Sequence, residues 1–161
     1  MASHPPGLSG TGAESSAGRH GYPWPVIDHG IALPYHRLHV VPAVVALASP
    51  TWQRETWLDP ERLEDLAHTV HVLFDDFCHA DDPAPCLGYS LRTEEEVELM
   101  ARLGTAYGAV QDAVGATAPD EAYLDAPGWP AVISVAARLA QVMVTNDLLA
   151  LEKLHQAGHP S

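Results

Sequence analysis

The sequence contains little positive charge and few cysteines. Among 161 residues, Lys and Arg together number 8, against 21 Asp and Glu, which gives a net charge of −13. Such a surface repels the phosphate backbone, so the composition argues against binding of nucleic acids. Two cysteines, Cys78 and Cys86, are too few for a disulfide framework, and the sequence predicts that both are thiols.

Long apolar runs are also missing. No stretch approaches the roughly 18 consecutive apolar residues that a membrane span needs. The N-terminus does not have the basic start and apolar core of a secretory signal, so we expect a cytoplasmic protein without a membrane segment. Hydrophobic residues nevertheless make up 47% of the chain, enough to build a packed core at this length.

The composition divides the chain into two parts. Residues 1–34 are rich in Pro, Gly and Ser, and they predict a disordered tail that cannot bury enough apolar surface to fold. In residues 35–161 the apolar side chains recur at helical spacing, and no alternating strand pattern is found. The sequence therefore predicts a single all-α domain, a bundle of about four main helices.

The first two helices are expected at residues 35–48, with Pro42 inside, and from Asp59 to about Cys78. Asp59 has the side chain of an N-cap, and Pro60 suits the first helical position. Apolar residues at helical spacing then predict the stripe that faces the core. These residues are Leu63, Leu66, Val70, Leu73, Phe74 and Phe77.

The third helix is expected to open at Thr93–Glu96, which reads as a capping box, and to stop at Gly115. A short helical turn is expected at Asp120–Leu124. The last helix is expected to begin after Asp125 and to end at about Leu154, and its apolar residues lie on more than one face. Such a helix must be covered by its neighbours or by a second subunit, so a homodimer through this helix is a further expectation.

The negative charge is concentrated in the middle of the chain. Between Asp59 and Asp125 there are sixteen Asp and Glu but three Arg, so this segment carries the whole imbalance. A concentrated acidic surface attracts a basic protein partner, which suggests a non-enzymatic interaction module of the immunity or adaptor kind, without a cofactor. The simpler interpretation is that the negative charge only keeps the protein soluble. The candidate contacts are Asp75, Asp81, Asp82, Glu94, Glu95 and Glu98.

A metal site is the alternative hypothesis. His68, His71 and Asp75 are spaced to share one helical face, and Cys78 follows closely. Imidazole, carboxylate and thiolate are the ligands that Zn²⁺ prefers, so a metal-binding protein or a metal-dependent enzyme remains open. The same residues lie opposite the apolar stripe, where an amphipathic helix carries polar side chains in any case. No HExxH, GxSxG or nucleotide loop is present, so the sequence leans against an enzyme.

A short pattern along the chain resembles a known family. The pattern consists of Leu73–Asp76, Asp81–Pro83, Gly88, Glu94–Val97, Glu121–Tyr123 and Trp129. It is similar to a family of small acidic hypothetical proteins from actinobacteria, over about residues 38–140. That family has no assigned reaction, cofactor or catalytic residue. The resemblance therefore implies a bacterial, cytoplasmic helical domain and no particular chemistry.

Overall fold

The fold is built from helices. The computed structural model of the chain describes residues 30–158, and in this range it contains no β-strand, so the predicted all-α fold is confirmed. The α-helices are α1 (Pro34–Leu47), α2 (Pro50–Thr56), α3 (Leu66–His71), α4 (Glu94–Val114), α5 (Asp120–Leu124) and α6 (Trp129–Gly158). A π-helical turn (Val72–Asp76) continues α3, and a 3₁₀ turn spans Ala84–Cys86.

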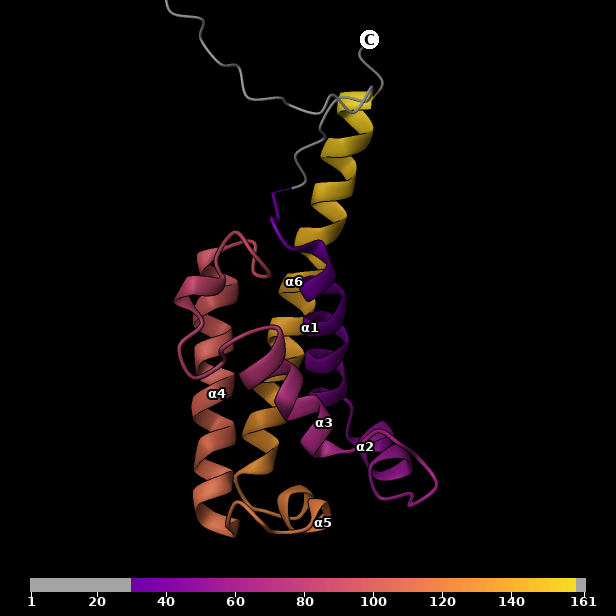
Figure 1. Ribbon diagram of the computed structural model, residues 1–161, viewed down its shortest axis with the longest axis vertical. Helices are drawn as coiled ribbons and strands as arrows, with labels where there is room; N and C mark the ends of the chain where they lie inside the picture. The colour runs from indigo at the N-terminus through magenta and orange to yellow at the C-terminus, as the bar shows by residue number, and fades with distance from the viewer. Residues whose placement is uncertain (1–29, 159–161) are drawn as a thin grey trace, which may run out of the picture.

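Three long helices form the body of the bundle. α6 packs most extensively against α4 and next against α1, while α3 and its π-helical extension lie against α1 (Figure 1). The short helices α2 and α5 lie at one end of the molecule, and α6 projects beyond α1 and α4 at the other (Figure 1). The interior is shared by these helices, and its fully buried large side chains include Leu47, Leu73, Met100, Leu103, Leu139 and Met143.

The packed domain begins earlier than predicted. Residues 31–34, which the composition assigned to the tail, belong to it, because Ile31 is buried. The backbone N–H of Ala32 donates to the carbonyl of Gly88 at 2.8 Å, and that of Leu33 donates to Tyr89 at 3.1 Å. The predicted disorder of residues 1–29 falls outside the described residues.

The predicted start of the second helix was wrong. The side chain of Asp59 accepts from the backbone N–H of Glu61 at 2.9 Å and supports a turn. The N-cap is Asp65, whose carboxylate accepts from the N–H of His68 at 2.8 Å. Leu63 was expected in the core stripe but is 98% exposed, because it precedes the helix. An Asp-Pro pair is also typical of a turn, and in this structure Asp59 and Pro60 belong to a turn before the helix.

The predicted start and end of α4 are confirmed, and only the hydrogen bonds of Glu96 differ from the prediction. Thr93 is the N-cap and accepts from the N–H of Glu96 at 3.2 Å, and α4 ends at Gly115, where φ is +96°. The carboxylate of Glu96, however, does not close the box on Thr93. It accepts from the N–H of Arg92 at 2.7 Å and lies in the interior, where it meets charged groups of other helices.

The helix α6 has two different halves. The 30-residue helix is long and apolar enough to cross a membrane by length and composition, a property that our sequence analysis did not anticipate. The core helix of a soluble bundle meets the same criterion, and the buried residues of α6 lie between Trp129 and Met143. Beyond Met143 no residue of α6 is buried in the described part of the chain.

Candidate functional site

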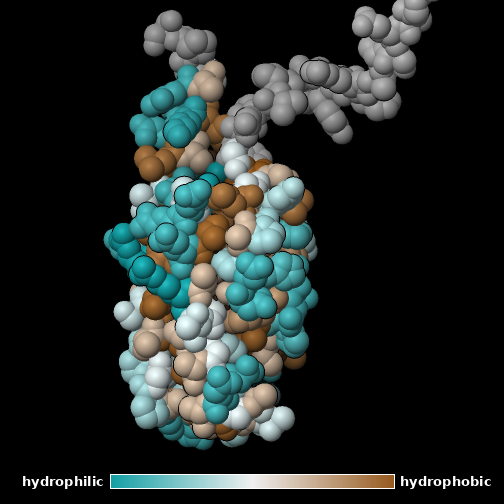
Figure 2. Space-filling view, turned by 90° about the vertical axis from the view of Figure 1, so that its left-hand side faces the viewer, coloured by the Kyte–Doolittle hydropathy of each residue, from teal (hydrophilic) through white to brown (hydrophobic). Residues whose placement is uncertain are grey.

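The carboxylates of the middle segment lie mainly on the surface. Of the sixteen between Asp59 and Asp125, all are exposed except Glu96, which is buried, and Asp59 and Asp120, which are half-buried. Figure 2 views the side of the molecule on which α4 lies and shows hydrophilic residues in several patches, with apolar residues between them. We call these exposed carboxylates between residues 59 and 125 the acidic surface.

Close packing holds the loop that carries two of these carboxylates against α4, the helix that carries several others. A Cβ atom added to Gly104 would lie 2.2 Å from the carbonyl oxygen of Ala80, so the loop that carries Asp81 and Asp82 touches the helix there. Gly104 follows Glu98 by six residues, about 9 Å along an α-helix. Glu98 therefore lies less than two helical turns, and Glu94 less than three, from the point where the loop touches α4.

The candidate partner-binding residues differ in how far they are already paired. Asp75 lies 2.7 Å from His71, and Glu95 accepts from Arg138 at 3.0 Å. The other four carboxylates have no hydrogen bond or ion pair within the described residues, so their charge is available to a partner. They are Asp81, Asp82, Glu94 and Glu98.

The residues of the predicted metal site are not brought together. His71 and Asp75 form the expected i, i+4 contact and are both exposed. His68 instead lines a cavity of about 420 Å³ with His39 and Trp52. Within the described residues no group of three or more His, Cys, Asp or Glu is arranged to hold a metal ion.

The two cysteines form a buried pair of thiols. The Sγ atoms of Cys78 and Cys86 lie 3.4 Å apart, and both side chains are buried and not disulfide-bonded. Burial, reinforced by the neighbouring Cys86, raises the pKa of Cys78 to about 12. A metal ligand must be a thiolate, so this environment disfavours Cys78 in that role.

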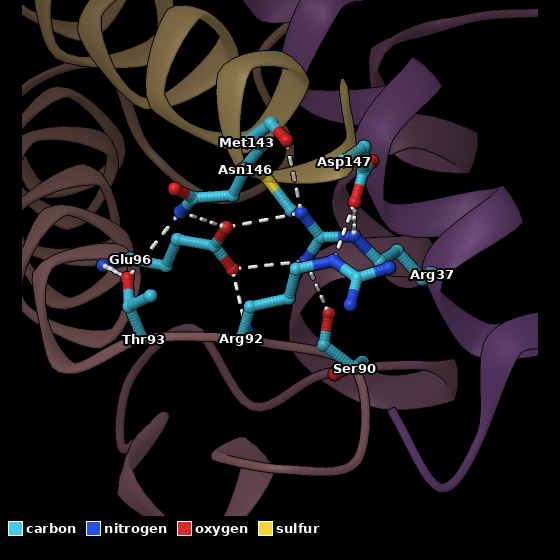
Figure 3. A network of polar contacts seen from close by, with 8 residues as sticks. All are labelled: Arg37, Ser90, Arg92, Thr93, Glu96, Met143, Asn146 and Asp147. Carbon is cyan, nitrogen blue, oxygen red and sulfur yellow. Dashed lines mark hydrogen bonds and ion pairs between the residues drawn. The ribbon is translucent and has the colours of Figure 1, made fainter. Parts of the chain in front are cut away.

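Sequence reasoning missed a charged network in the interior. Arg37 of α1 is buried, and its guanidinium lies between Glu96 of α4 and Asp147 of α6 (Figure 3). It donates to both oxygens of Glu96 at 2.9 and 3.0 Å and to Asp147 at 2.7 Å. It also donates to the carbonyls of Ser90 and Met143, so all five N–H groups are used.

The carboxylate of Glu96 is equally saturated. One oxygen accepts from Arg37 and from Asn146 at 2.8 Å, and the other accepts from Arg37 and from the N–H of Arg92. Burial lowers the pKa of Arg37, but Glu96 and Asp147 more than offset this, so the pKa is raised above its ordinary value. Every donor of Arg37 is used within the network, which therefore joins α1, α4 and α6.

These features define a helical bundle with a charged network in its interior and an acidic exterior. The chain belongs to a family described as a domain of unknown function (DUF7945), whose model matches residues 31–150. The membership confirms the predicted relation to an uncharacterised family. No curated protein and no solved structure matches this chain.

Proposed function

We propose that this protein is a non-enzymatic interaction module whose acidic surface binds a basic protein partner. The observation that carries the proposal is that four of the six candidate contacts, Asp81, Asp82, Glu94 and Glu98, are exposed carboxylates with no hydrogen bond or ion pair within the described residues. Concentrated like charge costs stability through self-repulsion. A surface that keeps such charge unpaired is suited to a partner that supplies the missing cations.

Electrostatic complementarity would act mainly on the encounter and on specificity. An acidic surface attracts a basic partner over a distance of about one Debye length, roughly 8 Å at physiological salt, and disfavours acidic competitors. Asp75 and Glu95 would complete the contact at its edge, where their present partners His71 and Arg138 are exposed and can move aside. His79, which is exposed in the same loop, would lie at the rim.

The setting of this interaction is part of the proposal. The resemblance described above suggests an actinobacterial protein that acts in the cytoplasm, as an adaptor or as an immunity-like protein that neutralises a basic enzyme. The fold supports a binding role in one respect. The network around Arg37 and the loop packed on Gly104 hold the acidic surface on fixed elements, so little order has to be gained when a partner binds.

Affinity capture tests this proposal. The tagged chain is incubated with lysate of the organism that encodes it, at low and at high salt, and captured proteins are quantified by mass spectrometry. We expect a basic partner whose recovery falls with salt and falls about tenfold or more when Asp81, Asp82, Glu94 and Glu98 become Asn or Gln. The estimate follows from losing four exposed pairs, each worth up to about 1 kcal/mol.

A control variant separates the position of the charges from their number. E55Q/D112N/E121Q/E152Q removes the same total charge from exposed residues outside the six candidate contacts, and two of these residues, Asp112 and Glu121, belong to the acidic surface. It should capture the partner nearly as well as the natural chain. Equal capture by all three proteins, or capture that does not depend on salt, would show that Asp81, Asp82, Glu94 and Glu98 do not bind the partner and would contradict the proposal.

A further inference from the structure

The exposed half of α6 presents an apolar seam. Val144, Leu148 and Leu151 are spaced by four and then three residues, so their side chains lie on one face of the helix. Their exposed fractions are 44%, 62% and 60%, and Leu149 beside them is 49% exposed. This spacing is the one by which helices pair in coiled coils, and an exposed apolar seam of this kind indicates a binding surface.

A groove continues the seam onto α1. It has a volume of about 470 Å³ and contains Leu38, which is 72% exposed, and Leu151 of the seam. The charged residues Arg37, Arg92 and Asp147 also line it, but they are bonded to one another or to Glu96. The rest of the lining is apolar and includes Ile31, Pro34, Leu38, Val41, Leu151 and Leu154.

The charge distribution favours a second copy of the chain as the occupant. A chain with a net charge of −13 repels its own copies wherever their acidic surfaces approach. The exposed half of α6 is different, because after Met143 its charged residues are Asp147, which is paired with Arg37, and the neighbours Glu152 and Lys153. Two copies can approach at this end with the least repulsion.

We propose that two copies associate about a two-fold axis through the second half of α6. The seams of Val144, Leu148 and Leu151 pair, and leucines of each copy enter the groove beside Leu38 of the other. A two-fold interface requires one surface that complements itself, and a seam next to a groove meets this condition. The pair would carry its two acidic surfaces away from the contact, and this inference does not depend on the proposed function.

Light scattering coupled to size exclusion tests the proposal on the full chain across micromolar concentrations. We expect twice the mass of the 17.3 kDa chain. In L148Q/L151Q the mass should fall to that of one chain, because four leucines lost per dimer weaken association by at least about a hundredfold. The circular dichroism of the variant should not change, since both leucines are exposed.

A second pair of exposed leucines provides the matched control. L58Q/L63Q alters the connection before α3, away from the seam, and should remain dimeric. A natural chain with the mass of one copy at all concentrations overturns the proposal.

Two further results would assign the seam to another occupant and equally overturn the proposal. One is a natural chain with the mass of one copy and a Y22S/W24S variant with twice that mass. Because Tyr22 and Trp24 are aromatic residues of the N-terminal segment, this result would indicate that the chain's own N-terminal segment covers the groove. The other is a natural chain that has the mass of one copy and binds vesicles of phosphatidylglycerol and phosphatidylcholine, with this binding lost in L148Q/L151Q. That result would indicate a lipid surface.

Discussion

Replacing Arg37 by methionine should lower the free energy of unfolding by about 3–5 kcal/mol, the cost of leaving a buried charge without its partner. The variant keeps much of the side-chain volume but strands the carboxylate of Glu96 and removes the donor to the carbonyls of Ser90 and Met143. The effect is read from urea or thermal unfolding followed by circular dichroism.

An exposed ion pair serves as the control for this variant. Arg54 donates to Asp125 at 2.9 Å, and both side chains are more than half exposed, so Arg54→Met should cost less than about 1 kcal/mol. The double variant Arg37→Met/Glu96→Gln should be less destabilised than the sum of the two single variants, because the second change removes the stranded charge. Similar small costs for Arg37→Met and Arg54→Met would contradict the assignment of a buried network.

Replacing Gly104 by alanine should destabilise the domain by about 3 kcal/mol, at the upper end for an overpacked interior. The new Cβ atom would meet the carbonyl oxygen of Ala80 at 2.2 Å and its carbon at 2.8 Å. Because both atoms belong to the backbone, no side chain can rotate to make room. The loop must move, and with it Asp81 and Asp82, so binding of the basic partner should weaken as well.

Gly108 is the matched control, one helical turn along α4. A Cβ atom there would meet nothing within 4 Å. Gly108→Ala should therefore stabilise the domain by up to about 1 kcal/mol through helix propensity alone. Thermal unfolding of the two variants measures the difference, and equal stabilities would show that the loop does not pack on α4 at Gly104.

Local signals predicted the parts of the fold that local interactions decide. Thr93 and Gly115 mark the two ends of α4 because an N-cap hydroxyl and a glycine with positive φ act within a few residues. The choice between Asp59 and Asp65 as the start of the second helix could not be made in this way. It depends on distant contacts, since the N–H of Leu66 donates to Asp120, 54 residues later.

The interior network was missed for a similar reason. Arg37 is 59 residues from Glu96 and 110 from Asp147, and no local pattern reports such contacts. A signal was nevertheless present. Arg37 is the one residue of Pro34–Leu47 that carries a full charge, and Asp147 is one of two charged residues between Ala126 and Leu151. An isolated charge in an apolar helix predicts a buried partner, because burying it unpaired is too costly.

The acidic surface was predictable in composition but not in arrangement. Counting residues located the charge between Asp59 and Asp125, and helical periodicity predicted that His71 and Asp75 would be neighbours. Counting could not reveal that Glu96 points inward and that Cys78 is buried with Cys86. The position of the loop that carries Asp81 and Asp82 could not be predicted either, because it depends on the close contact of Gly104 with Ala80.

The association rate constant between this chain and its captured partner, measured at increasing ionic strength, tests the central claim most directly. If the acidic surface attracts the partner, the rate constant should fall about tenfold or more from low to physiological salt. The fall should be much smaller in the variant lacking the charges of Asp81, Asp82, Glu94 and Glu98. A rate constant that does not change with ionic strength, or one that is the same in this variant, would contradict the account.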